Sequence, residues 1–185
     1  MALLLLSGLI VAANATGAAL AQSAPAARAV FVDPHAAFVA EASQRFGIPE
    51  LWIIAVKRAE SAGNVRAVSS AGALGLMQVM PDTGRQMARV IGEPFDQPRM
   101  TKDAEYNARL GAAYLHGLRD RFGPSIALVA AGYNAGPGRS ARWLRDFGDL
   151  RIAGRAGADP VDWVEMIPFD ETRTYVMRVA ESLPI

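Results

Sequence analysis

The sequence predicts a mainly α-helical domain whose only β-structure is at most a very small hairpin. Its 185 residues suit one domain rather than two. With 51% hydrophobic and 20% charged residues, the chain has an ordinary globular composition with enough apolar material for a core. Apolar side chains recur at spacings of three and four along most segments, and strand signals are few. Together these observations favour a compact bundle of short helices.

The first 21 residues differ from the rest because they carry no charged side chain and are rich in Leu and Ala. Ala19-Leu20-Ala21 fits a small-x-small cleavage site ahead of Gln22. We therefore predict a signal peptide at 1–21, a flexible lead-in at 22–32 and the folded domain at 33–185. The predicted location is outside the cytoplasmic membrane.

A retained membrane anchor is the competing interpretation of this leader. No Lys or Arg precedes the apolar run, as a signal peptide would normally require, and the run approaches spanning length. Asn14, Thr16 and two glycines interrupt it, however, so we favour cleavage.

The first half of the domain is expected to hold three helices. Asp33-Pro34 supplies an N-cap and a first-turn proline for the first of them, which ends near Gly47. The second opens after Pro49, and the third opens at Pro81. Between these two, residues 64–80 are irregular or form a small β-hairpin. The expected helices and the loop that follows them are 33–47, 50–60, 81–92 and the loop 93–100.

The second half begins with a long helix from Asp103 to Gly123. Its apolar side chains recur at helical spacing. The next helix, 125–133, is apolar all round and should be buried. Further helices are expected at about 139–147, 161–166 and 171–182. Among the loops, we expect 148–158 to be the most mobile.

Glu60 is the first candidate functional residue, because it stands where a helix should bury hydrocarbon. Ile53, Val56 and Glu60 lie at positions i, i+3 and i+7 of the second helix, so the carboxyl shares a face with apolar side chains. Such a carboxyl tends toward a raised pKa, which a general acid needs at neutral pH. The alternative is an exposed, idle residue at a fraying helix end.

The segment after Glu60 contains two closely spaced glycines, Gly72 and Gly75. They suggest backbone conformations closed to residues with a Cβ, or backbone lying close to a ligand. Gln78 and Ser69 are neutral donors and acceptors that suit acetamido and hydroxyl groups better than phosphate. These residue types favour a sugar-binding site next to the acid.

Three blocks of the chain, in order, resemble a known family. They are Glu60-Ser61 followed by Ala71 to Pro81 (AGALGLMQVMP), then Ala131 to Gly138 (AGYNAGPG), then Trp163 to Val176. The chain is similar to the soluble lytic transglycosylases of bacterial cell walls, within the lysozyme superfamily, over roughly residues 34–179. The resemblance implies a lysozyme-like transglycosylase domain. Gly132 departs from the more usual alanine, and the last helix is short.

The resemblance implies cleavage of the β-1,4 bond between N-acetylmuramic acid and N-acetylglucosamine in peptidoglycan. A usual glycosidase needs two carboxylates flanking the bond. After Glu60 the next acid is Asp82, which suits the first turn of its helix. Transglycosylases of this family need no second carboxylate. In them one glutamate protonates the leaving oxygen and then deprotonates the C6 hydroxyl, which closes a 1,6-anhydro ring. Glu60 is the residue to which we assign both steps.

By the same resemblance, Ser69, Gln78 and Met80 would line the sugar-binding groove, although Met80 fits the core equally well. Tyr133 and Asn134 end the buried helix just before a Gly-Pro-Gly run. Tyr133 could hydrogen-bond the acid or the N-acetyl group, or be a packed aromatic with a satisfied hydroxyl. Asn134 could bind substrate or cap the turn.

The last candidate for substrate binding is Glu165. It shares a helix face with Val161 and either looks into the groove or is a solvated surface acid. Glu171, Thr172 and Arg173 are interpreted as structural, with Arg173 paired internally.

Composition argues against several other functions. The net charge of +1 and the lack of a basic run give no case for nucleic acid. Zero cysteines exclude disulfides and thiolate metal sites, and the two histidines are far apart. We expect no metal, no cofactor and a monomer.

Two other functions remain open at this point. A hydrolytic goose-type lysozyme would share the fold and the single glutamate, and only its product would differ. A non-catalytic peptidoglycan-binding or assembly module of a secretion apparatus would have no need for an acid on an apolar face. The expected partners are peptidoglycan glycan strands and, on weaker grounds of small size, a secretion or conjugation apparatus that spans the cell envelope.

Overall fold

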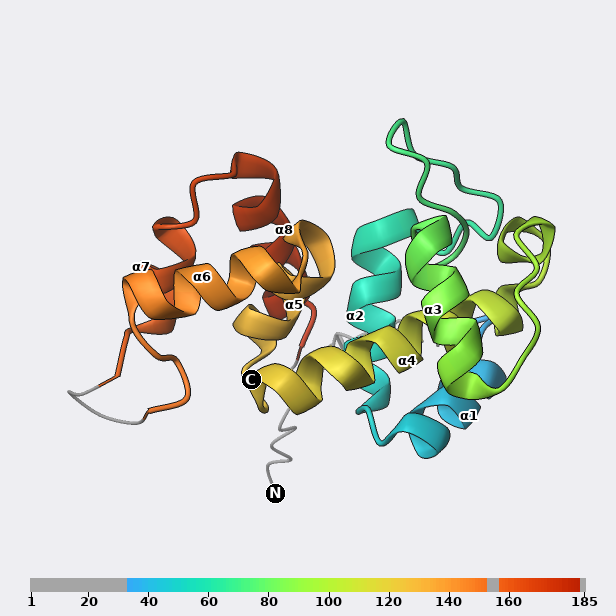
Figure 1. Cartoon of the computed structure of the whole chain (residues 1–185), viewed down its shortest axis with the longest axis horizontal. Coiled ribbons are helices and arrows are strands. Elements are labelled where there is room, and N and C mark those ends of the chain that lie inside the picture. The colour runs from blue at the N-terminus through green and yellow to red at the C-terminus, as the bar shows by residue number, and fades with distance from the viewer. Residues whose placement is uncertain (1–32, 153–156, 184–185) are drawn as a thin grey trace, which may run out of the picture. The chain divides into compact units, whose positions relative to one another are not determined.

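A computed structural model describes residues 33–152 and 157–183 of the chain. The predicted signal peptide and lead-in, and part of the predicted mobile loop, lie outside these residues. The described part contains eight α-helices and one 3-10 helix, which confirms the mainly α-helical class (Figure 1). They are α1 Ala36–Phe46, α2 Glu50–Ser61, α3 Pro81–Ile91, η1 Pro98–Thr101, α4 Ala104–Phe122, α5 Ile126–Ala135, α6 Pro137–Phe147, α7 Pro160–Glu165 and α8 Asp170–Glu181.

The expected hairpin between α2 and α3 is reduced to single-residue bridges. Leu74 pairs antiparallel with Val68 on one side and with Val79 on the other. The chain reverses at Gly75, where the Gln78 N–H donates to the Gly75 carbonyl at 3.1 Å. A turn this tight leaves no length for a ladder, so the segment is a folded loop.

The helix starts agree with the sequence except in detail. Asp103 caps α4, because its side chain accepts a hydrogen bond from the Tyr106 N–H at 3.0 Å. Asp33 was expected to cap the first helix, but His35 directly precedes α1 and the Asp33 carboxylate accepts the His35 N–H at 3.0 Å. Helix α6 begins at Pro137 rather than at residue 139, because proline fits the first turn of a helix.

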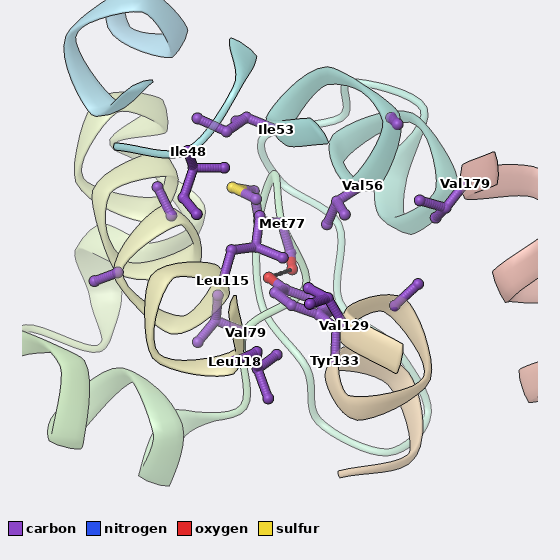
Figure 2. Packing of buried hydrophobic residues seen from close by; sticks show 14 of the residues in the cluster. Ile48, Ile53, Val56, Met77, Val79, Leu115, Leu118, Val129, Tyr133 and Val179 are labelled. Carbon is purple, nitrogen blue, oxygen red and sulfur yellow. Dashed lines mark hydrogen bonds between the residues drawn. The ribbon is translucent and has the colours of Figure 1, made fainter. Parts of the chain in front are cut away.

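The core gathers around α5, which is buried all round as its sequence predicts. Helix α5 packs against α4, α6 and α8, and α2 also contacts α8. Figure 2 shows Ile53 and Val56 of α2, Leu115 of α4 and Val129 of α5 around Met77. Burying apolar side chains of this size stabilises the fold by about 1.5–3 kcal/mol each.

Lys57 of α2 is deeply buried, which is rare for a lysine. Only 3% of its surface is exposed, and its ammonium group is paired with the Asp33 carboxylate. Burial opposes ionisation of Asp33, but the hydrogen bond and charge of Lys57 hold the pKa of that carboxyl below its ordinary value. The pair joins the start of the domain to α2, three residues before Glu60.

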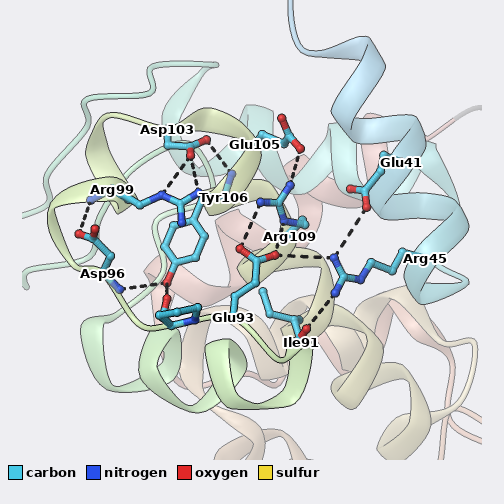
Figure 3. Close-up of polar contacts among 11 residues, drawn as sticks. Glu41, Arg45, Ile91, Glu93, Asp96, Arg99, Asp103, Glu105, Tyr106 and Arg109 are labelled. Atoms are coloured by element: carbon cyan, nitrogen blue, oxygen red, sulfur yellow. Dashed lines mark hydrogen bonds and ion pairs between the residues drawn. The ribbon is translucent and has the colours of Figure 1, made fainter.

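A second polar network ties the segment between α3 and α4 to its neighbours (Figure 3). Glu93 forms an ion pair with Arg109 of α4 at 2.9 Å and lies 3.7 Å from Arg45 of α1. Arg99 pairs with Asp103 at 2.7 Å. These contacts fix residues 93–103, including Met100, whose carbonyl lies against the turn at Gly75.

Candidate active site

Glu60 opens into a pocket of about 470 Å³. It lies in the last turn of α2, below the buried Ile53 and Val56, as the helical spacing predicts. The pocket brings together α2, the loop before α3, the end of α5 and one face of α8. Its lining residues are Ala59, Glu60, Ser69, Gln78, Asn134, Asp170, Glu171, Thr174, Tyr175 and Arg178.

The environment of Glu60 favours its protonated form. Its side chain is half-buried, and loss of hydrating water raises the pKa of its carboxyl from 4.5 to about 7. The neighbouring Tyr175 hydroxyl acts in the opposite direction and lowers the pKa, whereas the negative charge of Glu171 raises it further. Near neutral pH this carboxyl can therefore both donate and accept a proton.

The two tyrosines near Glu60 have different roles in the structure. The hydroxyl of Tyr133 donates to the Met77 carbonyl at 2.8 Å (Figure 2), so of the two alternatives for Tyr133 the packed aromatic fits this geometry. The hydroxyl of Tyr175 is buried and forms no hydrogen bond with the described residues. It nevertheless lies near enough to Glu60 for each group to shift the pKa of the other. Tyr175 is thus the donor available to the acid.

Gln78 reaches the pocket through a strained backbone. Its φ of +45° lies in the left-handed region, which is uncommon for a residue with a side chain. Its amide donates to the carbonyl of Gly75 at 2.8 Å and to that of Ala67 at 3.2 Å. An amide has two donors, so its carbonyl oxygen is the atom left to accept a hydrogen bond from a ligand.

Three more of the predicted groove residues, Ser69, Asn134 and Met80, line the Glu60 pocket or the pocket beside it. Ser69 lines the Glu60 pocket, and its hydroxyl accepts the Ala73 N–H at 2.9 Å. Asn134 lines the same pocket and accepts a 2.7 Å hydrogen bond from the Thr172 hydroxyl. Met80 is 43% exposed and lines an adjoining pocket with Gln78 and Asn134. Of its two alternatives, the structure supports the groove and not the core.

Glu165 does not line the Glu60 pocket. It is exposed and borders a separate, largely apolar hollow between α5, α7 and α8, together with Val161. The face that it shares with Val161 is directed at this hollow. Substrate binding by Glu165 therefore stays a prediction that its position does not support.

Sequence reasoning missed the contribution of α8. Glu171, Thr174, Tyr175 and Arg178 all line the pocket, and they stand at positions i, i+3, i+4 and i+7 of one helix. That periodicity was the available signal. Glu171 was interpreted as structural, whereas Arg173 is paired internally with Asp170 and the Ile167 carbonyl, as predicted.

No group of His, Cys, Asp or Glu within residues 33–152 and 157–183 is arranged to hold a metal ion. No helix in the same ranges combines the length and hydropathy that crossing a membrane would need.

The family model described as the transglycosylase SLT domain matches residues 37–154. The chain belongs to this family, which confirms the resemblance inferred from its motifs.

Curated relatives agree with this assignment. The chain is 41% identical to the soluble lytic murein transglycosylase of Escherichia coli (strain K12) over 133 residues, which are 71% of this chain and 20% of the relative. It is 32% identical to membrane-bound lytic murein transglycosylase C of Histophilus somni (strain 2336) in an alignment of 168 positions that covers 83% of this chain and 46% of the relative. The chain therefore spans about a fifth of the length of the soluble relative and about half that of the membrane-bound one.

Solved structures share the fold. An inactive glutamate-to-glutamine variant of lytic transglycosylase Slt from Pseudomonas aeruginosa superimposes with a TM-score of 0.72 at 37% identity, over 82% of this chain and 24% of that one. The 70-kDa soluble lytic transglycosylase of Escherichia coli gives a TM-score of 0.71 at 36% identity, over 80% of this chain and 23% of that one. The lysozyme-like transglycosylase fold is confirmed.

The raised pKa of Glu60 predicts how stability depends on pH. Between pH 4.5 and about 7 the unfolded chain ionises Glu60 while the folded chain keeps it protonated, so the free energy of unfolding falls as pH rises. Because the carboxyl faces an open pocket, the total loss is at most about 3 kcal/mol. Glu60→Gln should remove it, so urea titrations at pH 4 and pH 8 should show the variant gaining on the native chain only at pH 8. An equal difference at both values would contradict the pKa assignment.

Proposed function

We propose that this chain is a peptidoglycan lytic transglycosylase that cleaves the bond between N-acetylmuramic acid and N-acetylglucosamine, with Glu60 as its general acid and base. The observation that carries the proposal is the position of Glu60: a carboxyl with a pKa of about 7, in a pocket also lined by neutral hydrogen-bonding groups. The names of the relatives support the substrate, and the inactive Pseudomonas variant is consistent with an essential glutamate in the family.

The proposed reaction has two proton transfers. Protonated Glu60 gives its proton to the glycosidic oxygen as the bond to the anomeric carbon breaks, and the N-acetyl carbonyl of the substrate stabilises that carbon. The resulting carboxylate then takes the proton of the C6 hydroxyl, whose oxygen closes the 1,6-anhydro ring. Glu60 ends the cycle protonated, and no water is consumed.

Gln78 and Tyr175 have supporting roles in this scheme. The free carbonyl oxygen of Gln78 is suited to accept the N–H of an acetamido group. The Tyr175 hydroxyl stabilises the carboxylate formed after the first transfer, because it favours the ionised form of Glu60.

A hydrolytic lysozyme is a second candidate, and one observation favours it. The sequence contains no acid between Glu60 and Asp82, but the fold brings Glu171 into the Glu60 pocket. A second carboxylate could activate water for attack on the anomeric carbon. Products decide between the two functions, since water attack leaves a reducing muramic acid end.

Digestion of purified sacculi tests the assignment. The native chain should release 1,6-anhydromuropeptides, detected by mass spectrometry, and Glu60→Gln should lower the rate by at least about 10²–10⁴-fold because both proton transfers are lost. Asp82→Asn, which changes a first-turn acid of α3 outside the pocket, is the matched control and should retain activity. Reducing ends alone would assign the chain to the lysozymes, and a Glu60→Gln rate within tenfold of native would remove Glu60 from its role.

The alkaline side of the activity profile should respond to two neighbours in opposite directions. Activity should fall as pH rises through about 7, because the acid must begin protonated. Glu171→Gln removes a charge that raises the pKa of Glu60 and should move this fall to lower pH. Tyr175→Phe removes a donor that lowers the pKa and should move it to higher pH. Initial rates across pH 5 to 9 check both, and shifts in the same direction would contradict the role of at least one of the two neighbours.

Export is the remaining part of the proposal. The substrate lies outside the cytoplasmic membrane, so we propose a periplasmic protein whose leader is cleaved after Ala21. N-terminal sequencing from the native host should find Gln22 as the first residue in the soluble periplasmic fraction. An intact Met1 in the membrane fraction would establish the anchor instead. A monomeric state and an association with a secretion or conjugation apparatus stay predictions.

A further inference from the structure

We propose that Asn107 is a positioning residue that sets the affinity of the site for glycan by holding the turn at residues 74–78. This inference rests on the proposed function. Asn107 lies near the start of α4 and is fully buried. Its side-chain oxygen accepts the Met77 N–H at 2.8 Å, and its amide nitrogen donates to the carbonyls of Leu74 at 2.9 Å and Met100 at 3.0 Å.

The turn packs against α4 so closely that two positions have no room for a side chain. A Cβ on Gly75 would lie 1.9 Å from the Met100 carbonyl oxygen and 2.4 Å from the Asn107 amide nitrogen. A Cβ on Gly111, one turn further along α4, would lie 2.5 Å from the Met77 sulfur. Gly75, Gly111 and the buried Asn107 amide therefore fit closely around Met77, and we call these three residues the Met77 seat.

Gln78 connects this seat to the Glu60 pocket. Gln78 follows Met77 directly and bonds back to the Gly75 carbonyl, so its place beside Glu60 depends on the turn. Ser61 fixes the other side, because its hydroxyl donates to the Leu76 carbonyl at 2.6 Å. The turn is thus the structural link between α4 and the glycan-binding amide.

The two residues that act on the pKa of Glu60, Tyr175 and Glu171, belong to α8 and not to this turn. Displacing the turn should therefore weaken substrate binding while leaving the proton transfers of Glu60 intact. A variant that only destabilised the fold would instead reduce substrate binding and proton transfer together.

Asn107→Asp is the sharpest test, because it keeps the shape and the acceptor for Met77 while it removes both donated hydrogen bonds. With sacculi as substrate and well below the melting temperature, the apparent KM should rise about tenfold or more, as expected for a lost buried hydrogen bond. The turnover number should stay within about twofold, and the alkaline fall in activity should stay at the same pH because proton transfer is unchanged.

Ser140→Ala is the matched control. It removes another buried bond from a side chain to a backbone carbonyl, that of the Ser140 hydroxyl to Leu128 at 2.9 Å, on helices α5 and α6. It should lower stability without changing KM. An equal rise of KM in this control, or a shifted pH profile in Asn107→Asp, would overturn the proposal.

Amide hydrogen exchange gives a reading that does not depend on activity. Asn107→Asp removes the two hydrogen bonds that hold the turn to Leu74 and Met100, so the Met77 N–H within that turn should exchange at least about tenfold faster than in native protein or in Ser140→Ala. If native protein does not act on sacculi, the proposed function fails and this arm still tests the turn. Unchanged Met77 exchange would overturn the inference. If Asn107→Asp does not fold, Asn107→Ser, which keeps a small hydroxyl in the seat, carries the same expectations.

Discussion

The structure depends on one closely fitted contact, that between the turn at Gly75 and the start of α4. Asn107 bonds to three backbone groups there, and no side chain larger than hydrogen fits at Gly75. The Tyr133 hydroxyl and the Ser61 hydroxyl hold the same turn from α5 and α2. Side chains of three helices therefore hold residues 74–78, whose backbone is irregular. This support lets the loop between α2 and α3 present polar groups to a ligand although it is not part of a β-sheet.

The carboxyl of Glu60 is the second constraint, and it opposes stability. A half-buried acid with a pKa of about 7 destabilises the folded chain at neutral pH, which is consistent with the catalytic role that we propose for Glu60. The surrounding helix α2 compensates through Ile53 and Val56, which are completely buried. Helix α8 supplies both an acid, Glu171, and a hydroxyl, Tyr175, that set the proton affinity of Glu60 in opposite directions.

Much of this arrangement follows from local sequence patterns. The order of the helices and the buried character of α5 were predicted from the spacing of apolar residues, and Gly72 and Gly75 do have positive φ. Small errors occurred at the helix starts, because caps depend on single hydrogen bonds. The pair of Lys57 with Asp33 was not predicted, because the two residues lie on separate segments and a sequence pattern does not show which charges will meet.

By itself the sequence determined the fold class, the candidate acid and the family, since these rest on periodicity within one helix and on short contiguous motifs. Only the tertiary structure decided which residues share a pocket with Glu60. It brought Glu171, Tyr175 and Arg178 to the acid, and it directed Glu165 to a different hollow. It also revealed Asn107, whose importance lies in three backbone partners distant in sequence or across a turn. Such contacts follow from how helices pack, and a one-dimensional pattern carries no record of that packing.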